Sequence, residues 1–152
     1  MTATNHVITG ALIAAAIQNS WLALPMALLA HFVMDALPHD GNRADEAAAL
    51  ARLKWLLPID AGIAGSVLVT ILFLQPLHWP LIVAGAILCA SPDLLQIPRF
   101  TRFLRTGDSR PSKDWFSQFH SRIQWGERTW GFLVEVPWAL TGLFILANLV
   151  VI

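Results

Sequence analysis

Apolar residues fall into five segments that are separated by short polar stretches. A helix needs about 20 apolar residues to cross the hydrocarbon core of a bilayer. The third and fifth segments are long enough for this, whereas the other three are shorter. We therefore expect an all-α polytopic membrane bundle of about five membrane segments, of which the first two form a short helical hairpin. The segments are residues 7–17, 21–37, 55–74, 77–90 and 132–152.

The composition favours a membrane location. Hydrophobic residues make up 56% of the chain and charged residues 13%, whereas about a quarter of the residues in ordinary soluble proteins are charged. We expect the 152 residues to form one integral membrane domain, residues 1–152, which is too short to include a separate catalytic module as well. The single cysteine, Cys89, excludes a disulfide framework and a metal site built from several cysteines.

Charged residues are concentrated in two loops, residues 38–54 and 96–129. The turn at 18–20 and the connection at 75–80 carry no Lys or Arg. Because basic loops stay in the cytoplasm, we expect both charged loops and the N-terminus there, and five spans then place the C-terminus outside. Within the first loop, residues 44–53 are typical of a short interfacial helix that precedes the third segment.

Three potential metal ligands lie at helical spacing near the end of the second apolar segment. His31 and Asp35 are four residues apart and share one helix face, and His39 follows at the next such interval, beside Pro38, which should end the helix. Ionisable groups inside an apolar segment are costly unless they are paired, bind a metal or face a wet cavity. This stretch is therefore the first candidate for a metal site.

The expected topology brings further histidines and aspartates to the same membrane face. His6 begins the first segment, Asp60 lies early in the third, Asp93 ends the fourth, and His120 lies in the second charged loop. Imidazole and carboxylate ligands suit zinc, with iron or manganese also possible. The sequence therefore predicts a divalent metal site at this face, with the ligands His6, His31, Asp35, His39 and Asp93.

Three residues are candidates for catalysis. Asp60 or Glu135 could act as the general base, and His120 could lie over the site on a helix anchored in the membrane surface by aromatic residues. Glu135 could instead pair with Arg128, which we favour. Asp60 could equally be a helix cap or the ion-pair partner of a nearby arginine.

Other residues allow two interpretations each. Arg99 and Arg102 could bind a substrate phosphate, although arginines in a cytoplasmic loop are more often topology signals. His6 alone could be a polar residue at a helix start, and Asp93 could be a capping or ion-paired residue. His78 lies in the uncharged turn at the opposite end and is expected to be an interfacial residue, so it serves as a control.

The block His31-Phe32-x-x-Asp35-x-x-Pro38-His39 resembles the His-Phe-x-x-Asp motif, followed by a proline and a histidine, of the zinc-dependent phospholipase C and single-strand nuclease superfamily. Most of the chain is similar to small bacterial membrane proteins that are labelled membrane-bound metal-dependent hydrolases. These proteins share an early Thr-x-His-like start, here Thr4-Asn5-His6, and a Pro-Asp segment, here Pro92-Asp93. The other histidines of the superfamily have no clear counterpart in this chain.

The resemblance implies a zinc site and a location in the bacterial inner membrane. His31, Asp35 and His39 match the ligand block, His6 matches the early ligand histidine, and Asp93 is a further carboxylate. It also implies a hydrolase.

We expect a membrane-embedded metal-dependent hydrolase with one or two ions, which acts on a phosphoester of a lipid or amphiphile at the cytoplasmic membrane surface. A metal ion lowers the pKa of a bound water, and a second ion or Arg99 would offset charge on the phosphate. Nucleic acid is not expected as a partner. Two alternatives remain: a protein that transports or handles metal ions or small solutes, and a non-catalytic membrane adaptor with a structural metal. Transport needs polar residues along the full membrane depth, whereas here they cluster at one end.

Single cysteines in place of Arg43 and Leu77, in a Cys89→Ser background, test the predicted topology. The positive-inside rule places position 43 in the cytoplasm and position 77 outside. A membrane-impermeant maleimide added to intact cells should therefore label position 77 and spare position 43. If both positions react from the same side, the predicted membrane face of the ligands is wrong.

Overall fold

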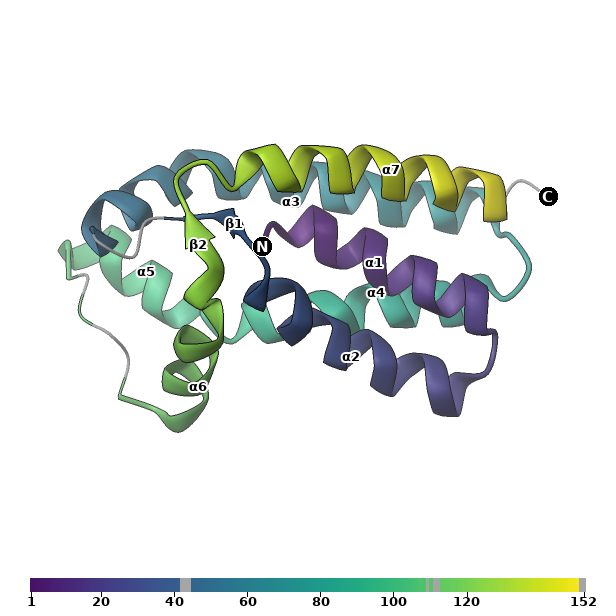
Figure 1. Ribbon diagram of the computed structural model, residues 1–152, viewed down its shortest axis with the longest axis horizontal. Coiled ribbons are helices and arrows are strands. Elements are labelled where there is room, and N and C mark those ends of the chain that lie inside the picture. Colours follow the sequence, from purple (N-terminus) through teal and green to yellow (C-terminus); the bar gives the residue numbers. More distant parts are fainter. Residues whose placement is uncertain (42–44, 109, 111–112, 151–152) are drawn as a thin grey trace.

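The computed structural model describes the whole chain except residues 42–44, 109, 111–112 and 151–152 (Figure 1). The described residues are predominantly helical, which confirms the predicted all-α class. Two short strands, β1 (His39–Asp40) and β2 (Glu127–Arg128), pair in parallel. The helices are α1 (Ala3–Ile17), α2 (Ser20–Ala36), α3 (Glu46–Leu74), α4 (Trp79–Leu94), α5 (Ile97–Thr106), α6 (Trp115–Ile123) and α7 (Phe132–Val150), with a 3₁₀ turn at Gln124–Gly126.

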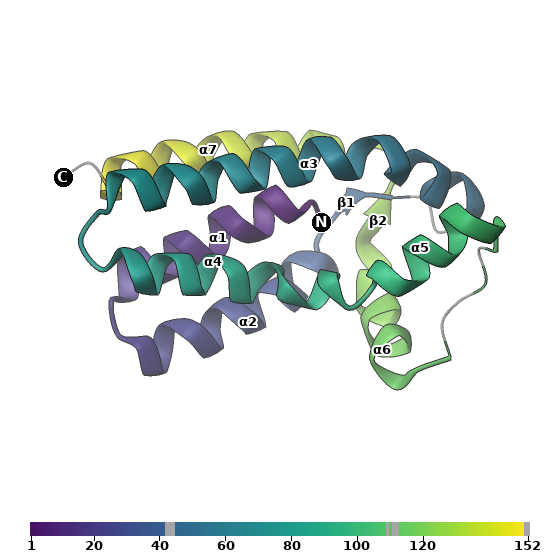
Figure 2. The ribbon, with the colours of Figure 1, turned by 180° about the vertical axis from the view of Figure 1, so that it is seen from behind.

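The long helices run roughly along one axis, with α1 in their midst (Figure 1). α3 and α7 run in the same direction along one side of α1, and α2 and α4 return along the other side, as the view from behind also shows (Figure 2). The starts of α1 and α7 therefore meet the ends of α2 and α4 at one end of the bundle. We call this the polar end; it consists of residues 1–6, 31–40, 91–99 and 114–135.

Two helices are long and apolar enough to cross a membrane, Ala51–Leu74 within α3 and Phe132–Val150, and little of either is buried within the protein. α4 and α5 form a third span if the 43° bend between them lies within one crossing. α1 and α2 form the expected short hairpin, but their 15 and 17 residues are too few at about 1.5 Å per residue for a core about 30 Å thick. The predicted five spans are thus corrected to two or three.

α3 begins well before the third apolar segment. The side chain of Asp45 caps it by accepting a hydrogen bond from the backbone N–H of Ala48 at 2.9 Å, and the helix continues through Pro58 to Leu74. The separate interfacial helix predicted at 44–53 is therefore wrong, because the alanines and leucines of this stretch are strong helix formers and nothing breaks the helix. Residue 44, like the Arg43 of the topology prediction, lies outside the described residues.

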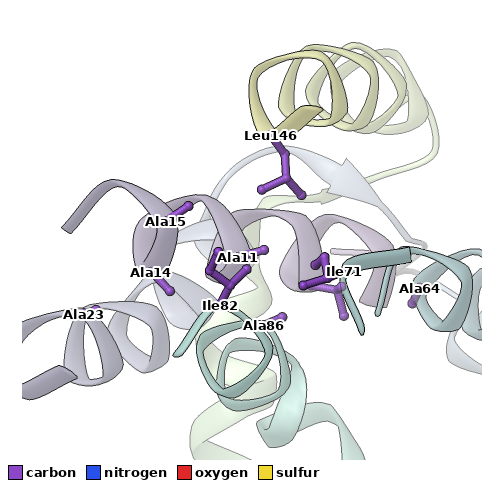
Figure 3. Packing of buried hydrophobic residues seen from close by; sticks show 10 residues of the cluster. Ala11, Ala14, Ala15, Ala23, Ala64, Ile71, Ile82, Ala86 and Leu146 are labelled. Carbon is purple, nitrogen blue, oxygen red and sulfur yellow. The ribbon is translucent and has the colours of Figure 1, made fainter. Parts of the chain in front are cut away.

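Small residues allow α1 to lie at the centre of the bundle (Figure 3). A Cβ on Gly10 of α1 would overlap the carbonyl oxygen of Gly85 of α4, and a Cβ on Gly85 would lie 2.7 Å from the Gly10 carbonyl oxygen. Because small residues let helix backbones approach closely, α1 contacts α2, α3, α4 and α7. The buried apolar cluster consists of Val7, Ala11, Ala14, Ala15, Ala23, Ala64, Ile71, Ile82, Ala86 and Leu146.

Replacing Gly85 with Ala should destabilise the bundle, because the new methyl group meets the Gly10 carbonyl and the Cβ of Ala14. We expect a loss of about 1–3 kcal/mol, as is typical of overpacking, seen as a lower thermal unfolding midpoint by circular dichroism in detergent. Gly62→Ala is the matched control, since an added Cβ there meets nothing within 4 Å and alanine favours a helix. Equal midpoints for the two variants would contradict the close crossing of α1 and α4.

Candidate metal centre

Histidine and aspartate side chains from three helices meet at the polar end. His31 and Asp35 of α2, Asp93 of α4 and His120 of α6 each place one ligand atom so that all four atoms lie within 4.8 Å of one another. His31, Asp35 and His120 are buried, while the side chain of Asp93 keeps 29% of its surface exposed. We call these four residues the metal group, because they could hold a metal ion.

The helical spacing of α2 sets the first pair of the metal group. Nε2 of His31 lies 3.3 Å from Oδ2 of Asp35, one turn later on the same face. Nε2 of His120 lies 2.7 Å from the same oxygen and 3.0 Å from Nε2 of His31. Ligands bound to one zinc ion at about 2.0–2.2 Å are separated by comparable distances. These three side chains could therefore bind one metal ion without large movements.

A backbone carbonyl fixes the orientation of His31. Its Nδ1–H donates to the carbonyl oxygen of Cys89 at 2.8 Å, so in the neutral ring the lone pair is on Nε2, which faces Asp35 and His120. Metal-ligating histidines are commonly held in this way, with the second ring nitrogen donating to a carbonyl or carboxylate. The contact with α4 thus prepares His31 as a ligand.

His6 of α1 lies beside the metal group, and its predicted role as a ligand stays a prediction. Its Nε2 lies 3.2 Å from Oδ1 of Asp35 and 3.7 Å from Oδ2 of Asp93, and its ring stacks on His31 with centroids 4.1 Å apart. The amino group of Met1 donates to the same Asp35 oxygen at 2.6 Å. The structure therefore brings together five of the predicted site residues, His6, His31, Asp35, Asp93 and His120.

His39 is buried on β1, beside Glu127 of β2. Its Nδ1–H donates to the carbonyl oxygen of Leu37 at 2.8 Å. Burial, followed by the positive amino terminus, lowers the pKa of His39 to about 4, so the ring is neutral near neutral pH. His39 is not one of the four residues of the metal group, and its predicted role as a ligand stays a prediction.

Asp60 caps the start of α1. Its Oδ2 accepts a hydrogen bond from the backbone N–H of Ala3 at 2.6 Å, and its Oδ1 accepts one from Thr4 at 3.0 Å. The first N–H groups of a helix have no acceptor within the helix, and a carboxylate there also interacts favourably with the helix dipole. These contacts favour the capping interpretation of Asp60, which orients the helix that carries His6. Its predicted role as a general base stays a prediction.

Glu135 lies buried near the start of α7, where its Oε1 accepts a hydrogen bond from the backbone N–H of Thr2 at 3.1 Å. In the part of the chain that the structure describes, Arg128 forms no ion pair with Glu135. The guanidinium donates instead to the carbonyl oxygens of Trp125 at 3.1 Å and Glu127 at 2.7 Å. The predicted ion pair between Arg128 and Glu135 is therefore wrong, because local backbone acceptors satisfy the arginine. The catalytic role of Glu135 stays a prediction.

The two arginines predicted to bind phosphate lie in different surroundings. Arg99 borders a cavity of about 300 Å³ between α5 and α6. Phe116, which also lines this cavity, stacks on His120 with centroids 5.8 Å apart, so the ring of Phe116 lies between the cavity and His120. Arg102 lies with its Nε 3.6 Å from Oδ2 of Asp108. The geometry therefore favours Arg99 over Arg102 as a residue near a bound substrate.

The sequence did not single out Gln124, whose Nε2 donates to Oδ2 of Asp35 at 3.4 Å. Its spacing of four residues from His120 was the available signal, because residues four apart on a helix share a face. His120 itself was predicted as a catalytic residue on a helix above the site, whereas the structure places it inside the metal group as a potential ligand.

Comparisons of the chain with protein-family models, with curated proteins and with solved structures found no match. The functional interpretation therefore depends on the residues themselves and on their geometry. The resemblance of the His31 to His39 block stays an expectation.

Removing a residue of the metal group should remove the metal. The purified protein should contain bound transition metal. His31→Ala or His120→Ala should lose most of the ion that the metal group binds, because each substitution deletes a ligand nitrogen. The measurement is metal per chain by mass spectrometry after dialysis against a weak chelator. His78→Ala is the control, since His78 is exposed at the opposite end of the bundle. Unchanged metal content in all three variants would contradict the assignment.

Proposed function

We propose that this chain is a membrane-embedded metal-dependent hydrolase that cleaves a phosphoester of a lipid or amphiphile at the membrane surface. The observation that carries the proposal is the metal group itself, in which histidines and carboxylates from separate helices meet. Zinc is the preferred ion for these nitrogen and carboxylate ligands, with iron or manganese as alternatives. The bacterial inner membrane is the proposed location.

A divalent ion bound by the metal group would supply a more acidic water and would offset charge on a phosphoryl group. The chain's own residues prepare the site for this. Cys89 orients His31 through its carbonyl, and Gln124 donates to Asp35. These contacts hold the ligand atoms in place before a substrate arrives, which lowers the cost of reorganisation during the reaction.

Aromatic rings shield one side of the metal group. Phe32 lies edge-on to His31, with centroids 5.1 Å apart, and also meets Phe119 of α6 at 5.6 Å. Phe116 stacks on His120. The partly exposed carboxylate of Asp93 marks the side that water and substrate can reach. The apolar shield keeps the dielectric low around the ligands, which strengthens their electrostatic interactions.

The surroundings of the cavity favour an amphiphilic substrate. Arg99 lines the cavity and could bind a phosphate through its guanidinium. Leu95 and Pro98 line the same cavity and offer contacts for an apolar portion. Trp115, at the start of α6, is 76% exposed, as is common for tryptophan at the headgroup level of a membrane. A lipid could then reach the metal group from the bilayer.

Transport of a metal or small solute is the main alternative. Such a path needs polar groups across the membrane, but the buried cluster between the helices consists of alanine, isoleucine, leucine and valine (Figure 3). The distribution of polar residues therefore supports hydrolysis at one surface. A non-catalytic adaptor with a structural metal is the remaining alternative.

The purified protein in detergent or liposomes should hydrolyse a chromogenic phosphate ester or a fluorescent short-chain phospholipid. Chelation should abolish the activity, and zinc or manganese should restore it. His120→Ala should lower kcat/KM by about a hundredfold or more, whereas His78→Ala should not change it. Arg99→Gln should mainly raise KM if Arg99 binds the phosphate in the ground state, with Arg105→Gln as the matched control.

The transport alternative predicts a different result. If a broad screen of phosphoesters and lipids gives no metal-dependent turnover, while liposomes that contain the protein accumulate metal ions, the hydrolase proposal fails. Metal-dependent turnover without ion flux supports it.

A further inference from the structure

The carboxylate of Asp35 presents its two oxygens to different histidines. Oδ1 lies 3.2 Å from Nε2 of His6. Oδ2 lies 3.3 Å from Nε2 of His31 and 2.7 Å from Nε2 of His120. One buried carboxylate therefore lies between histidines on both of its sides.

Asp93 repeats this arrangement. Its Oδ2 lies 3.7 Å from Nε2 of His6, while its Oδ1 lies 3.9 Å from Nε2 of His31 and 3.7 Å from Nε2 of His120. The ligand atoms thus form two sets that share no atom. The first set is His6 Nε2, Asp35 Oδ1 and Asp93 Oδ2, and the second set is His31 Nε2, His120 Nε2, Asp35 Oδ2 and Asp93 Oδ1.

We propose that this site holds two divalent transition-metal ions, one in each set, with Asp35 and Asp93 as bridging carboxylates. The inference rests on the metal centre of the proposed function, which by itself needs only one ion. Carboxylates bind metals through either oxygen, and ions in two-metal hydrolytic sites lie about 3.5–4 Å apart. Asp35 and Asp93 each have one oxygen in each set. A carboxylate that bridges two ions needs this arrangement.

The two sets offer different numbers of ligands. The second set supplies four protein atoms, which is the full complement of a tetrahedral ion. The first set supplies three and leaves a position for water or substrate, as catalytic zinc sites do. The amino group of Met1 donates to Oδ1 of Asp35 at 2.6 Å, so an ion in the first set would replace this donor at that oxygen. The first set is therefore the one that has a free coordination position for a water.

The charge of the site favours a second ion for phosphate chemistry. Two carboxylates neutralise one divalent ion, and the site would then attract an anionic phosphate only weakly. A second ion leaves the site positively charged and able to stabilise the charge that develops on a transferring phosphoryl group. His6, which is fully buried, supplies the additional neutral ligand without adding negative charge.

Metal stoichiometry and magnetic coupling test the proposal. The full chain, purified in detergent, is loaded with zinc, dialysed and measured by mass spectrometry for metal per chain. We expect about two ions in the unmodified protein, about one in His6→Gln and in His31→Ala, and close to none in Asp35→Asn. His78→Gln, the matched control for His6→Gln, should keep both ions. Circular dichroism checks that each variant keeps its helical content.

Loading with manganese provides a test that needs no variant. Two ions joined by carboxylates should give the spin-coupled electron paramagnetic resonance signal of a pair, whereas one ion gives an isolated signal. A single ion with an isolated signal, retained in His6→Gln, would overturn the two-ion site and leave a one-metal hydrolase intact. A coupled pair in a protein without phosphoester hydrolysis would support the two-ion site and overturn the proposed function.

Discussion

The buried carboxylate of Asp35 is the constraint on which the polar end depends. A negative charge inside an apolar bundle is costly unless other groups compensate for it. Asp35 is fully buried, and His6, His120 and Gln124 lie within 3.4 Å of its oxygens. These partners come from α1, α6 and the turn that follows α6, so satisfying one carboxylate requires the assembly of segments from both ends of the chain.

Close helix packing makes this assembly possible. Gly10 and Gly85 allow α1 and α4 to cross in contact, which brings the helix that carries His6 to the helix that carries Asp93. The same α4 supplies the Cys89 carbonyl that orients His31. Asp60 holds the start of α1 through two backbone hydrogen bonds. Apolar packing and the polar site are therefore mechanically connected, since a shift of α1 would move a ligand.

The segment after α6 packs closely against the end of α2. A Cβ on Gly126 would overlap the carbonyl oxygen of Leu37, and a Cβ on Gly131 would overlap the backbone of His39. Between these glycines, β2 pairs with β1. This close contact fixes the position of α6 and hence of His120 relative to His31 and Asp35. The rest of the bundle is apolar and exposes large hydrophobic side chains, which suits a lipid environment better than water.

The sequence by itself determined the helical class, the short hairpin and the placing of His31 and Asp35 on one helix face, because apolar periodicity and helical spacing are local properties. It could not determine the number of spans, since α1 and α2 are apolar but short. Only the tertiary structure placed His120 among the ligands, gave Asp60 its backbone partners and left Arg128 on local carbonyls. These outcomes depend on which distant segments pack together, and that information is not contained in the spacing of residues along any one helix.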